Sequence, residues 1–501
     1  MMDLTIREIA EACGGKLVVQ GDSADGDSSV SSVVIDSRLV EPGGVFIAVP
    51  GERVDGHAFI EGAFARGAIL AVTARTPQQV AAEYGKSEKT AAQENSGEAG
   101  KQAGCGWGCY VLVEDTLRAL RDIAEAYRKK LAVKTVGITG SSGKTSTKEF
   151  IAGVLGEKYS VLKTEGNFNN EIGVPLTLLR IRSEHEIAVV EMGISDFGEM
   201  HRLSRMVRPD VCVITNIGQS HLNNLIDREG ILRAKSEIFD FMAEEGRICL
   251  NAEDDILSGL GEIKGRRPHF FGLGDNAQAE VLMADIEGKG LLGSEAVLVM
   301  RGSARETRIS VRIPLPGEHM VLNAAAAACV ANLLGLTGEE IAAGMAGVSA
   351  VSGRTNIIRT SRNTIIDDCY NANPASVKAA VELLAMADTE KAAILGDMLN
   401  LGSESDRYHG EIGVLAAKLG IDRIVCVGEE SRHMYREARA HAGDRMETFW
   451  FPDTESLLEA LRGERESLAP EGSSVLVKAS HDLHFADVVK FLREETPDKS
   501  L

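Results

Sequence analysis

The sequence predicts an α/β protein of three domains: an N-terminal α/β module, a central domain with a parallel sheet, and a C-terminal Rossmann-like domain. The length of 501 residues suits about three domains of ordinary size. Strands alternate with helices in two separate stretches, which is typical of parallel, doubly wound sheets. In the first of these stretches a glycine-rich turn joins a strand to a helix. We place the domains at residues 1–113, 114–351 and 352–501.

The composition is globular, with 44% apolar and 26% charged residues. A formal net charge of −20 argues against nucleic acid as a partner, because the phosphate backbone is bound mostly by clustered Lys and Arg. The N-terminus is charged early and lacks the apolar core of a signal peptide. The longest apolar stretch, around residues 320–336, is interrupted by Asn323 and Asn332 and therefore predicts a packed helix. We expect a cytoplasmic monomer with no membrane span.

Short β-like runs mark the first domain, at residues 32–35 and 45–49, with Gly and Pro turns between them. Between about 83 and 108 the composition shifts to Lys, Glu, Gln, Ser, Gly and Ala, which predicts a solvated loop insertion. We assign this insertion no function. The cysteines Cys105 and Cys109 lie close together but form no CxxC pair, so free thiols are expected rather than a metal site or a disulfide.

The central domain is expected to begin with a helix over residues 114–130. A buried strand at 135–139 follows, then the glycine-rich turn and a helix at 144–155. Later strands are expected at 187–192 and 211–215. Because these strands alternate with helices, the sheet should be parallel and doubly wound.

The alternation begins again from about residue 352. Four strands are expected there, at residues 364–367, 392–395, 423–427 and 475–477. Helical stretches separate these strands, which predicts a second, smaller nucleotide-fold-like domain. A cleft between two α/β domains is the usual place for an active site.

The glycine-rich turn is the strongest local signal for function. It comprises Gly140, Ser141, Ser142, Gly143, Lys144 and Thr145, with Ser146 next in the helix. Small residues let backbone N–H groups approach phosphate oxygens, and the helix N-terminus adds positive potential. Lys144 would reach the β- and γ-phosphates of ATP, and the Thr145 hydroxyl would hold Mg²⁺. The longer P-loop pattern has a glycine where Ile138 stands, so an ordinary turn is the alternative; the flanking strand and helix favour a P-loop ATPase domain.

Two further side chains follow strands of the same domain and could bind the metal ion. Glu191 ends the strand at 187–192, where a carboxylate would face bound phosphates across the crest of the sheet. His221 lies in the loop after the strand at 211–215. A surface glutamate and a structural histidine are the alternatives.

Lys235 lies within the apolar stripe of an expected helix that begins near Glu229. A buried ammonium is costly, so its pKa falls, and a neutral amine could add CO₂ to become a carbamate that binds Mg²⁺. The alternative is a lysine whose stem packs while its head reaches solvent. On these residues alone the alternative is the stronger interpretation.

Taken together, these motifs resemble the Mur ligase family over essentially the whole chain apart from the insertion. The shared segments are residues 139–145, 191–193, the His221 loop, 234–235, 316–319, 323–324, 353–354 and 367–368. Three longer runs, at 166–179, 367–374 and 396–398, resemble the family members that join D-alanyl-D-alanine to UDP-N-acetylmuramoyl-tripeptide. Two rivals stay open: the related Mur ligase that adds the third amino acid, and a nucleotide-binding scaffold without turnover.

The resemblance implies a role for each motif residue. At the metal site, Lys144 and Thr145 would hold phosphate and Mg²⁺, Glu191 and His221 would be metal ligands, and Lys235 would be carbamylated. Around the nucleotide, Asn323 would contact adenine, Asp368 would contact the ribose, and Arg354 would contact the phosphates. The substrate-binding set would be Ser37, Arg38 and Phe46 at the uridine diphosphate end, Asn167, Asn169 and Asn170 along the channel, and Tyr370, Asn371 and Asn373 in the third domain.

The resemblance also implies a sequential reaction, in which ATP activates the tripeptide carboxylate as an acyl phosphate before the amine of D-alanyl-D-alanine attacks. Two departures from the family pattern lie in the third domain. Asn400 stands where the family usually has Glu, and Ala479 with His481 replaces the usual Gly-Ser-Arg after Lys478. Both departures concern the expected dipeptide site rather than the residues expected to carry the reaction.

Overall fold

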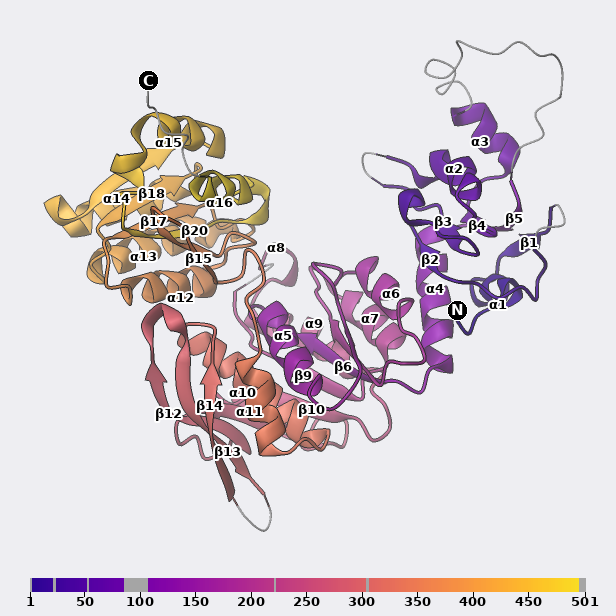
Figure 1. Cartoon of the computed structure of the whole chain (residues 1–501), viewed down its shortest axis with the longest axis horizontal. Coiled ribbons are helices and arrows are strands. Elements are labelled where there is room, and N and C mark those ends of the chain that lie inside the picture. The colour runs from indigo at the N-terminus through magenta and orange to yellow at the C-terminus, as the bar shows by residue number, and fades with distance from the viewer. Residues whose placement is uncertain are drawn as a thin grey trace. The chain divides into compact units, whose positions relative to one another are not determined.

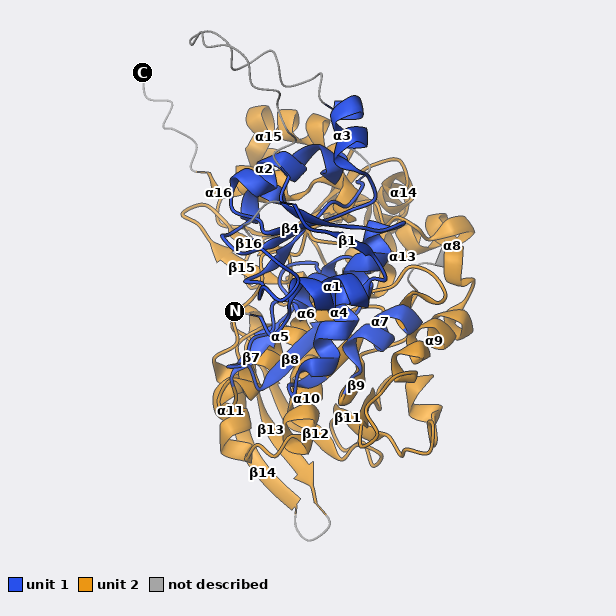
Figure 2. Cartoon of the chain, turned by 90° about the vertical axis from the view of Figure 1, so that its right-hand side faces the viewer, with its two compact units in different colours: residues 1–135, 160–192, 201–209 blue, residues 136–159, 193–200, 210–501 orange. Residues whose placement is uncertain are grey.

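The computed structural model describes residues 2–20, 24–51, 54–84, 107–219, 222–302 and 306–494. Most of the expected insertion, together with Cys105 and His221, therefore lies outside the described residues. The chain forms two compact units (Figure 2): unit 1 contains residues 1–135, 160–192 and 201–209, and unit 2 contains 136–159, 193–200 and 210–501. In the described part of the chain, no helix is both long and apolar enough to cross a bilayer.

Unit 1 begins with a five-stranded sheet of order β1-β5-β4-β3-β2, in which only β1 runs antiparallel to its neighbour. The strands are β1 (Lys16–Val18), β2 (Val33–Val34), β3 (Val45–Ile47), β4 (Leu70–Thr73) and β5 (Cys109–Leu112), and the helices are α1 (Ile6–Ala12), α2 (Ile60–Ala65) and α3 (Pro77–Tyr84). All residues of the central strands β3 and β4 are buried, as a continuous apolar run in a parallel sheet requires. The two strands expected in this domain are confirmed in shorter form.

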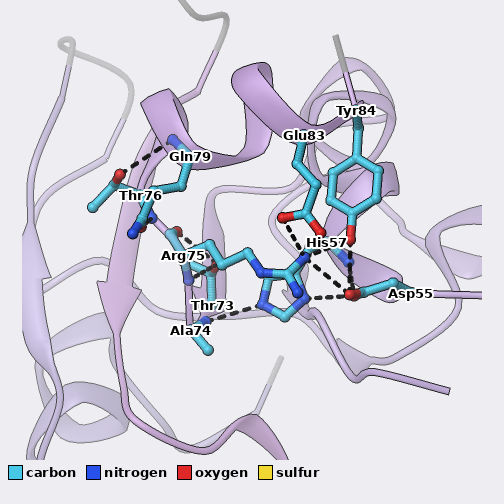
Figure 3. Close-up of polar contacts among 9 residues, drawn as sticks. All are labelled: Asp55, His57, Thr73, Ala74, Arg75, Thr76, Gln79, Glu83 and Tyr84. Atoms are coloured by element: carbon cyan, nitrogen blue, oxygen red, sulfur yellow. Dashed lines mark hydrogen bonds and ion pairs between the residues drawn. The ribbon is translucent and has the colours of Figure 1, made fainter. Parts of the chain in front are cut away.

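A polar cluster around Asp55 joins three segments of this domain (Figure 3). The Asp55 carboxylate accepts hydrogen bonds from His57 Nδ1 at 2.6 Å and Tyr84 Oη at 2.8 Å, and Arg75 Nη1 lies 2.9 Å away. The backbone N–H of Ala74 donates to His57 Nε2, which assigns the ring proton to Nδ1. Burial alone would raise the pKa of Asp55, but the hydrogen bonds from His57 and Tyr84 outweigh it and hold the pKa well below its usual range. The cluster therefore ties the end of α3 to the strand layer.

Replacing Asp55 with asparagine should destabilise this domain by about 2 kcal/mol at neutral pH, because the charged acceptor of the cluster is lost. The folded pKa lies below the unfolded value of about 3.9, so the stabilisation is fully present above pH ~5 and is lost as pH falls below ~4. Denaturant unfolding of both proteins from pH 3 to pH 7 measures this difference. Asp27→Asn, in the exposed pair with Arg7, is the matched control and should leave the midpoint unchanged. Equal midpoints for Asp55→Asn and the native chain at pH 7 would contradict the prediction.

Unit 1 also contains helix α4 (Thr116–Lys130), helix α6 (Gly173–Leu178) and the parallel strands β7 (Val161–Lys163) and β8 (Ile187–Glu191). The Asp115 side chain caps α4 by accepting from the backbone N–H groups of Leu117 and Arg118. The apolar face of α4 is buried, and its last turn carries three cations that favour a helix C-terminus. The expected helix at 114–130 and strand at 187–192 are confirmed within two residues.

Unit 2 contains a sheet whose strands run in the order β6-β9-β10-β11-β12-β13-β14. Figure 1 labels every strand of this sheet except β11. The strands are β6 (Lys134–Thr139), β9 (Val211–Ile214), β10 (Arg247–Asn251), β11 (His269–Leu273), β12 (Val281–Gly288), β13 (Ser294–Arg301) and β14 (Glu306–Ile313). Pairing is parallel from β6 to β12, as expected, but β12, β13 and β14 pair antiparallel. The helices include α5 (Lys144–Leu155), α9 (Arg228–Ser236), α10 (Glu318–Leu333) and α11 (Gly338–Ala346), and α10 packs against α5.

The last part of unit 2 is a six-stranded sheet of order β15-β16-β20-β17-β18-β19, parallel except for β15. Its strands are β15 (Asn356–Arg359), β16 (Thr364–Asp367), β17 (Lys391–Gly396), β18 (Arg423–Val427), β19 (Glu447–Phe451) and β20 (Ser474–Lys478). Two hydrophobic clusters lie on its two faces: α12 (Pro374–Ala385), α13 (Ser405–Lys418) and α14 (Ser431–Ala442) contribute to one, and α15 (Thr454–Leu468) and α16 (Ala486–Arg493) to the other. This arrangement confirms the Rossmann-like expectation.

Candidate active site

The glycine-rich turn connects the end of β6 to the start of α5, as expected. Gly140 and Gly143 have φ angles of +149° and +77°, which favour glycine. A Cβ atom on Gly140 would lie 1.9 Å from Thr215 Oγ1, and one on Gly143 would lie 2.9 Å from Asn323 Oδ1. The turn therefore needs glycine at both positions for conformation and for space.

The loop that follows β9 holds this turn in shape. Thr215 Oγ1 donates to the Ser142 carbonyl at 2.6 Å, and Asn216 Oδ1 accepts from the Ser142 N–H at 3.0 Å. Asn216 Nδ2 also donates to Ser142 Oγ at 2.8 Å, and the Gly218 N–H donates to Ser141 Oγ at 2.9 Å. Both serines of the motif are thus held by the neighbouring loop. Thr215 and Asn216 were not among the expected site residues, although their place at the carboxyl end of a parallel strand was a signal for them.

Lys144 and Thr145 begin helix α5. Lys144 Nζ donates to the Gly140 carbonyl at 2.8 Å, so the side chain bends back over the turn. The Thr145 side chain is buried, and Ser146 is half-buried. Asn323 reaches the same place from α10, where its Oδ1 accepts from Thr147 Oγ1 at 3.1 Å. The structure therefore brings Asn323 next to the phosphate loop, and its contact with adenine stays a prediction.

Lys235 lies on α9 with only 1% of its surface exposed. Burial lowers its pKa well below the ordinary value of 10.5, and the charge of Lys144 lowers it further. No carboxylate in the described part of the chain is among the groups that shift this pKa. The alternative of a head group that reaches solvent does not hold, and an uncharged amine near a cation is the form that these surroundings favour.

Glu191 ends β8 and is also buried, with 1% of its surface exposed. Its backbone N–H donates to Thr164 Oγ1 at 3.0 Å, and its carboxylate accepts from Asn169 Nδ2 at 2.8 Å. His221 lies outside the described residues. Among the residues that are described, no group of three or more His, Cys, Asp and Glu side chains could hold a metal ion by itself. Any metal ion here would therefore draw ligands from other groups as well.

The three asparagines of the 167–170 run have different surroundings. Asn169 Nδ2 donates to the Glu191 carboxylate, whereas Asn170 Oδ1 accepts from the N–H groups of Ile172 and Gly173 at the start of α6. Asn167 is exposed, and its carbonyl accepts from the Asn169 N–H at 2.7 Å. Substrate contacts for these residues stay predictions; Asn167 and Asn170 are exposed, whereas Asn169 is half-buried.

In the C-terminal part, the side chain of Arg354 stacks over the aromatic ring of Tyr370. The Arg354 guanidinium lies 3.9 Å from the ring centre, and the His481 ring centre lies 5.3 Å from it. Gly353, at φ +76°, allows this approach, because a Cβ there would lie 3.1 Å from Tyr370 Cβ. His481, a departure from the family pattern, therefore packs beside a residue expected at the site.

Asp368 forms a buried ion pair that the sequence did not predict. Its Oδ2 lies 2.6 Å from Lys478 Nζ, and its Oδ1 accepts from the Thr355 N–H at 3.0 Å. Lys478 Nζ also donates to the Asn371 carbonyl at 2.9 Å. Lys478 is thus a further candidate site residue, whose signal was its position at the end of β20. The side chain of Asn373 is used in the fold itself, because its Oδ1 accepts from the Ser376 N–H and caps α12.

The remaining residues that depart from the family pattern are Ala479 and Asn400, which lie in different surroundings. Ala479 is completely buried in the core of the third domain. Asn400 has a φ angle of +65°, a conformation that asparagine adopts more easily than glutamate does.

The expected contacts for the uridine diphosphate end lie in unit 1. Ser37 is buried in a short 3₁₀ helix (Ser37–Leu39), and the exposed Arg38 side chain pairs with Asp36 at 2.7 Å. The hydrogen bonds from Arg38 lower the pKa of Asp36 to about 2. Phe46 is completely buried in the hydrophobic core of the N-terminal sheet, so its visible role is packing. Substrate binding by these residues stays a prediction.

Three family models match the chain along its length. They are the Mur ligase family, catalytic domain, over residues 29–128, the Mur ligase middle domain over 138–331, and the Mur ligase, glutamate ligase domain over 353–481. The chain is 33% identical to the UDP-N-acetylmuramoyl-tripeptide–D-alanyl-D-alanine ligase of Bacillus subtilis, with 99% of both chains covered. It is 34% identical to the ligase of the same name from Treponema pallidum, over 99% of this chain and 100% of that one.

Solved structures agree with the sequence comparison. MurF from Acinetobacter baumannii matches with a TM-score of 0.80 and 30% identity, covering 98% of this chain and 99% of that one. MurF from Thermotoga maritima in complex with ADP matches with a TM-score of 0.72 and 28% identity, covering 92% and 97%. With three Mur ligase models matched along its length and 33% identity to a Mur ligase over 99% of both chains, this chain belongs to the Mur ligase family.

Proposed function

We propose that this chain joins D-alanyl-D-alanine to UDP-N-acetylmuramoyl-tripeptide with hydrolysis of ATP to ADP and phosphate, a step of peptidoglycan synthesis. The observation that carries the proposal is the match over nearly the whole chain to ligases of that name, at 30–34% identity. The phosphate loop and the buried Lys235 supply the local chemistry that such a reaction needs.

The reaction transfers a phosphoryl group and then an acyl group. A carboxylate oxygen of the tripeptide attacks the γ-phosphorus, the bond to ADP breaks, and an acyl phosphate forms. The amine of D-alanyl-D-alanine then attacks the acyl carbon, phosphate leaves, and the amine loses a proton. Two anions must approach each other in the first step, so the protein must chiefly position them and neutralise their charge. The amides of the glycine-rich turn, Lys144 and Arg354 would do both.

The side chains proposed as ligands are of the chemical kinds that bind Mg²⁺. A buried carboxylate at Glu191, the Thr145 hydroxyl and an anionic carbamate on Lys235 would hold it, with His221 as a further ligand. When bound, Mg²⁺ would neutralise charge on the phosphate oxygens. The carbamate forms when the neutral Lys235 amine attacks CO₂, which makes an N–C bond and releases one proton. The lowered pKa of Lys235 supplies the neutral amine, and the positive Lys144 nearby favours the anionic product.

The remaining assignments belong to the same proposal. Asn323 and Asp368 would contact adenosine, and the substrate-binding residues are those of the N-terminal module, the 167–170 run and the 370–373 run. The three domains of the proposal comprise residues 1–113, 114–351 and 352–501. The partners would be small molecules only, and the protein would act as a monomer. We place it in the cytoplasm, where its co-substrate ATP is made.

Phosphate release tests the proposed function. We expect release only when UDP-N-acetylmuramoyl-tripeptide, ATP, Mg²⁺ and D-alanyl-D-alanine are all present, and mass spectrometry should find the pentapeptide product. A ligase for the third amino acid would instead consume the dipeptide-bearing nucleotide and a single amino acid. A scaffold would bind ATP without release. Either of those two results would refute the proposal.

A further inference from the structure

The carboxylate of Glu191 receives a hydrogen bond from an asparagine that the family resemblance assigns to the substrate channel. Asn169 Nδ2 lies 2.8 Å from Glu191 Oε1. An ionised carboxylate only accepts hydrogen bonds, so the amide must turn its NH₂ group toward Glu191. Glu191 is buried and Asn169 is half-buried, which makes this contact stronger than an equivalent one at the surface.

The segment that carries Asn169 is fixed on both sides of it. Before it, Thr164 accepts from the Glu191 N–H at 3.0 Å and donates its own N–H to the Val189 carbonyl at 3.0 Å. After it, Asn170 Oδ1 accepts from the Gly173 N–H at 2.9 Å, and Gly173 packs so closely that a Cβ there would lie 2.2 Å from Phe168 Cα. The backbone of Asn169 therefore has little freedom, and its side chain presents one donor to Glu191 in a set direction.

We infer that Asn169 is a positioning residue for the metal site, and this role replaces the substrate contact proposed above for Asn169 as a member of the 167–170 run. The terminal torsion of a glutamate is broad, so an unsupported carboxylate can turn about its last bond. A donor held at Oε1 fixes the plane of the carboxylate and with it the direction in which Glu191 meets a divalent cation. The inference rests on the proposed function, because it takes Glu191 as a ligand of Mg²⁺.

The test compares two substitutions that remove the donor. Asn169→Ala shortens the side chain, and Asn169→Leu keeps its approximate volume, so a shared effect reports the hydrogen bond rather than a cavity. Glu165→Gln, at an exposed carboxylate on the same segment that pairs with Arg180, is the matched control, and Glu191→Gln tests the ligand itself. The probe is Mn²⁺, titrated against each protein with a non-hydrolysable ATP analogue and followed by the electron paramagnetic resonance signal of free Mn²⁺. Thermal unfolding without metal checks that each variant is folded.

Both Asn169 variants should bind Mn²⁺ at least about tenfold more weakly, the usual cost of losing a group that orients a metal ligand. The Mg²⁺ concentration for half-maximal phosphate release should rise by a similar factor, with an unchanged KM for the tripeptide substrate, and excess Mg²⁺ should restore turnover. Glu165→Gln should leave Mn²⁺ binding as it is. Unchanged Mn²⁺ affinity in folded Asn169 variants, with weaker binding in Glu191→Gln, would overturn this inference alone. Unchanged affinity in Glu191→Gln would overturn the metal assignment and the inference together.

Discussion

Replacing Lys235 with alanine should lower the rate of ligation by at least about 10²- to 10³-fold, the usual cost of losing one group that stabilises charge in a transition state. The native side chain is buried and its pKa is lowered, so the amine can be neutral and add CO₂. Alanine removes the carbamate and leaves a space. Acetate or propionate should partly restore the activity of Lys235→Ala without any dependence on bicarbonate, because a carboxylate can occupy that space.

Lys235→Met provides the control, since it also lacks the amine but fills the volume. It should be as inactive as Lys235→Ala and should not respond to short carboxylic acids. The loss of the amine should not by itself lower the melting temperature of either variant, because burying an amine costs free energy in the folded state. The carbamate itself can be observed by ¹³C nuclear magnetic resonance after labelling with ¹³CO₂, as a signal present in the native protein and absent from Lys235→Met. Full activity in either variant would end the carbamate proposal.

Replacing Lys144 with methionine should lower phosphate release by roughly 10²- to 10³-fold, because the cation that neutralises the transferring phosphoryl group is lost. Methionine keeps most of the side-chain volume, so the start of α5 should stay folded. The same change removes a positive charge that lowers the pKa of Lys235. That pKa should therefore rise, and the ¹³C carbamate signal should need a higher pH to appear.

Lys158→Met is the matched control for Lys144. Lys158 also donates its Nζ to a backbone carbonyl, that of Gly335 at 2.6 Å, but it lies beyond the far end of α5. Its replacement should leave phosphate release and nucleotide affinity unchanged. Steady-state rates with a fluorescent nucleotide displacement assay separate binding from turnover. If Lys144→Met kept native rates, the phosphate loop could not be the site of the reaction.

Short sequence patterns predicted helices and strands best where the conformation of each residue depends mainly on its neighbours in the sequence. Helix α5 begins at Lys144 and ends at Leu155 as expected, because a glycine turn starts it and apolar spacing continues it. The antiparallel strands β12, β13 and β14 were not predicted. β14 alternates charged and apolar residues at the edge of the sheet, and such a run is weakly apolar taken alone.

In the candidate site, too, the residues of one continuous segment were predicted, whereas contacts between distant segments were not. The glycine-rich turn is one continuous segment, so the sequence predicted all its members. Contacts that complete it join distant positions: Thr215 to Ser142 over 73 residues, and Lys478 to Asp368 over 110. No local pattern specifies such a partner, because the partner is brought near only by the pairing of strands. Burial of Lys235, by contrast, follows from the helical spacing of its apolar neighbours, but only the fold shows that the head group stays inside.

The hydrogen bonds from Thr215 and Asn216 to Ser142 have a consequence for nucleotide binding. Ordering a flexible backbone costs about 1–2 kcal/mol of conformational entropy per residue. A turn already held by its neighbour does not incur that loss when a triphosphate arrives, so more of the contact energy becomes affinity. Capture of ATP should accordingly proceed at a rate set by diffusive encounter with the turn rather than by its rearrangement.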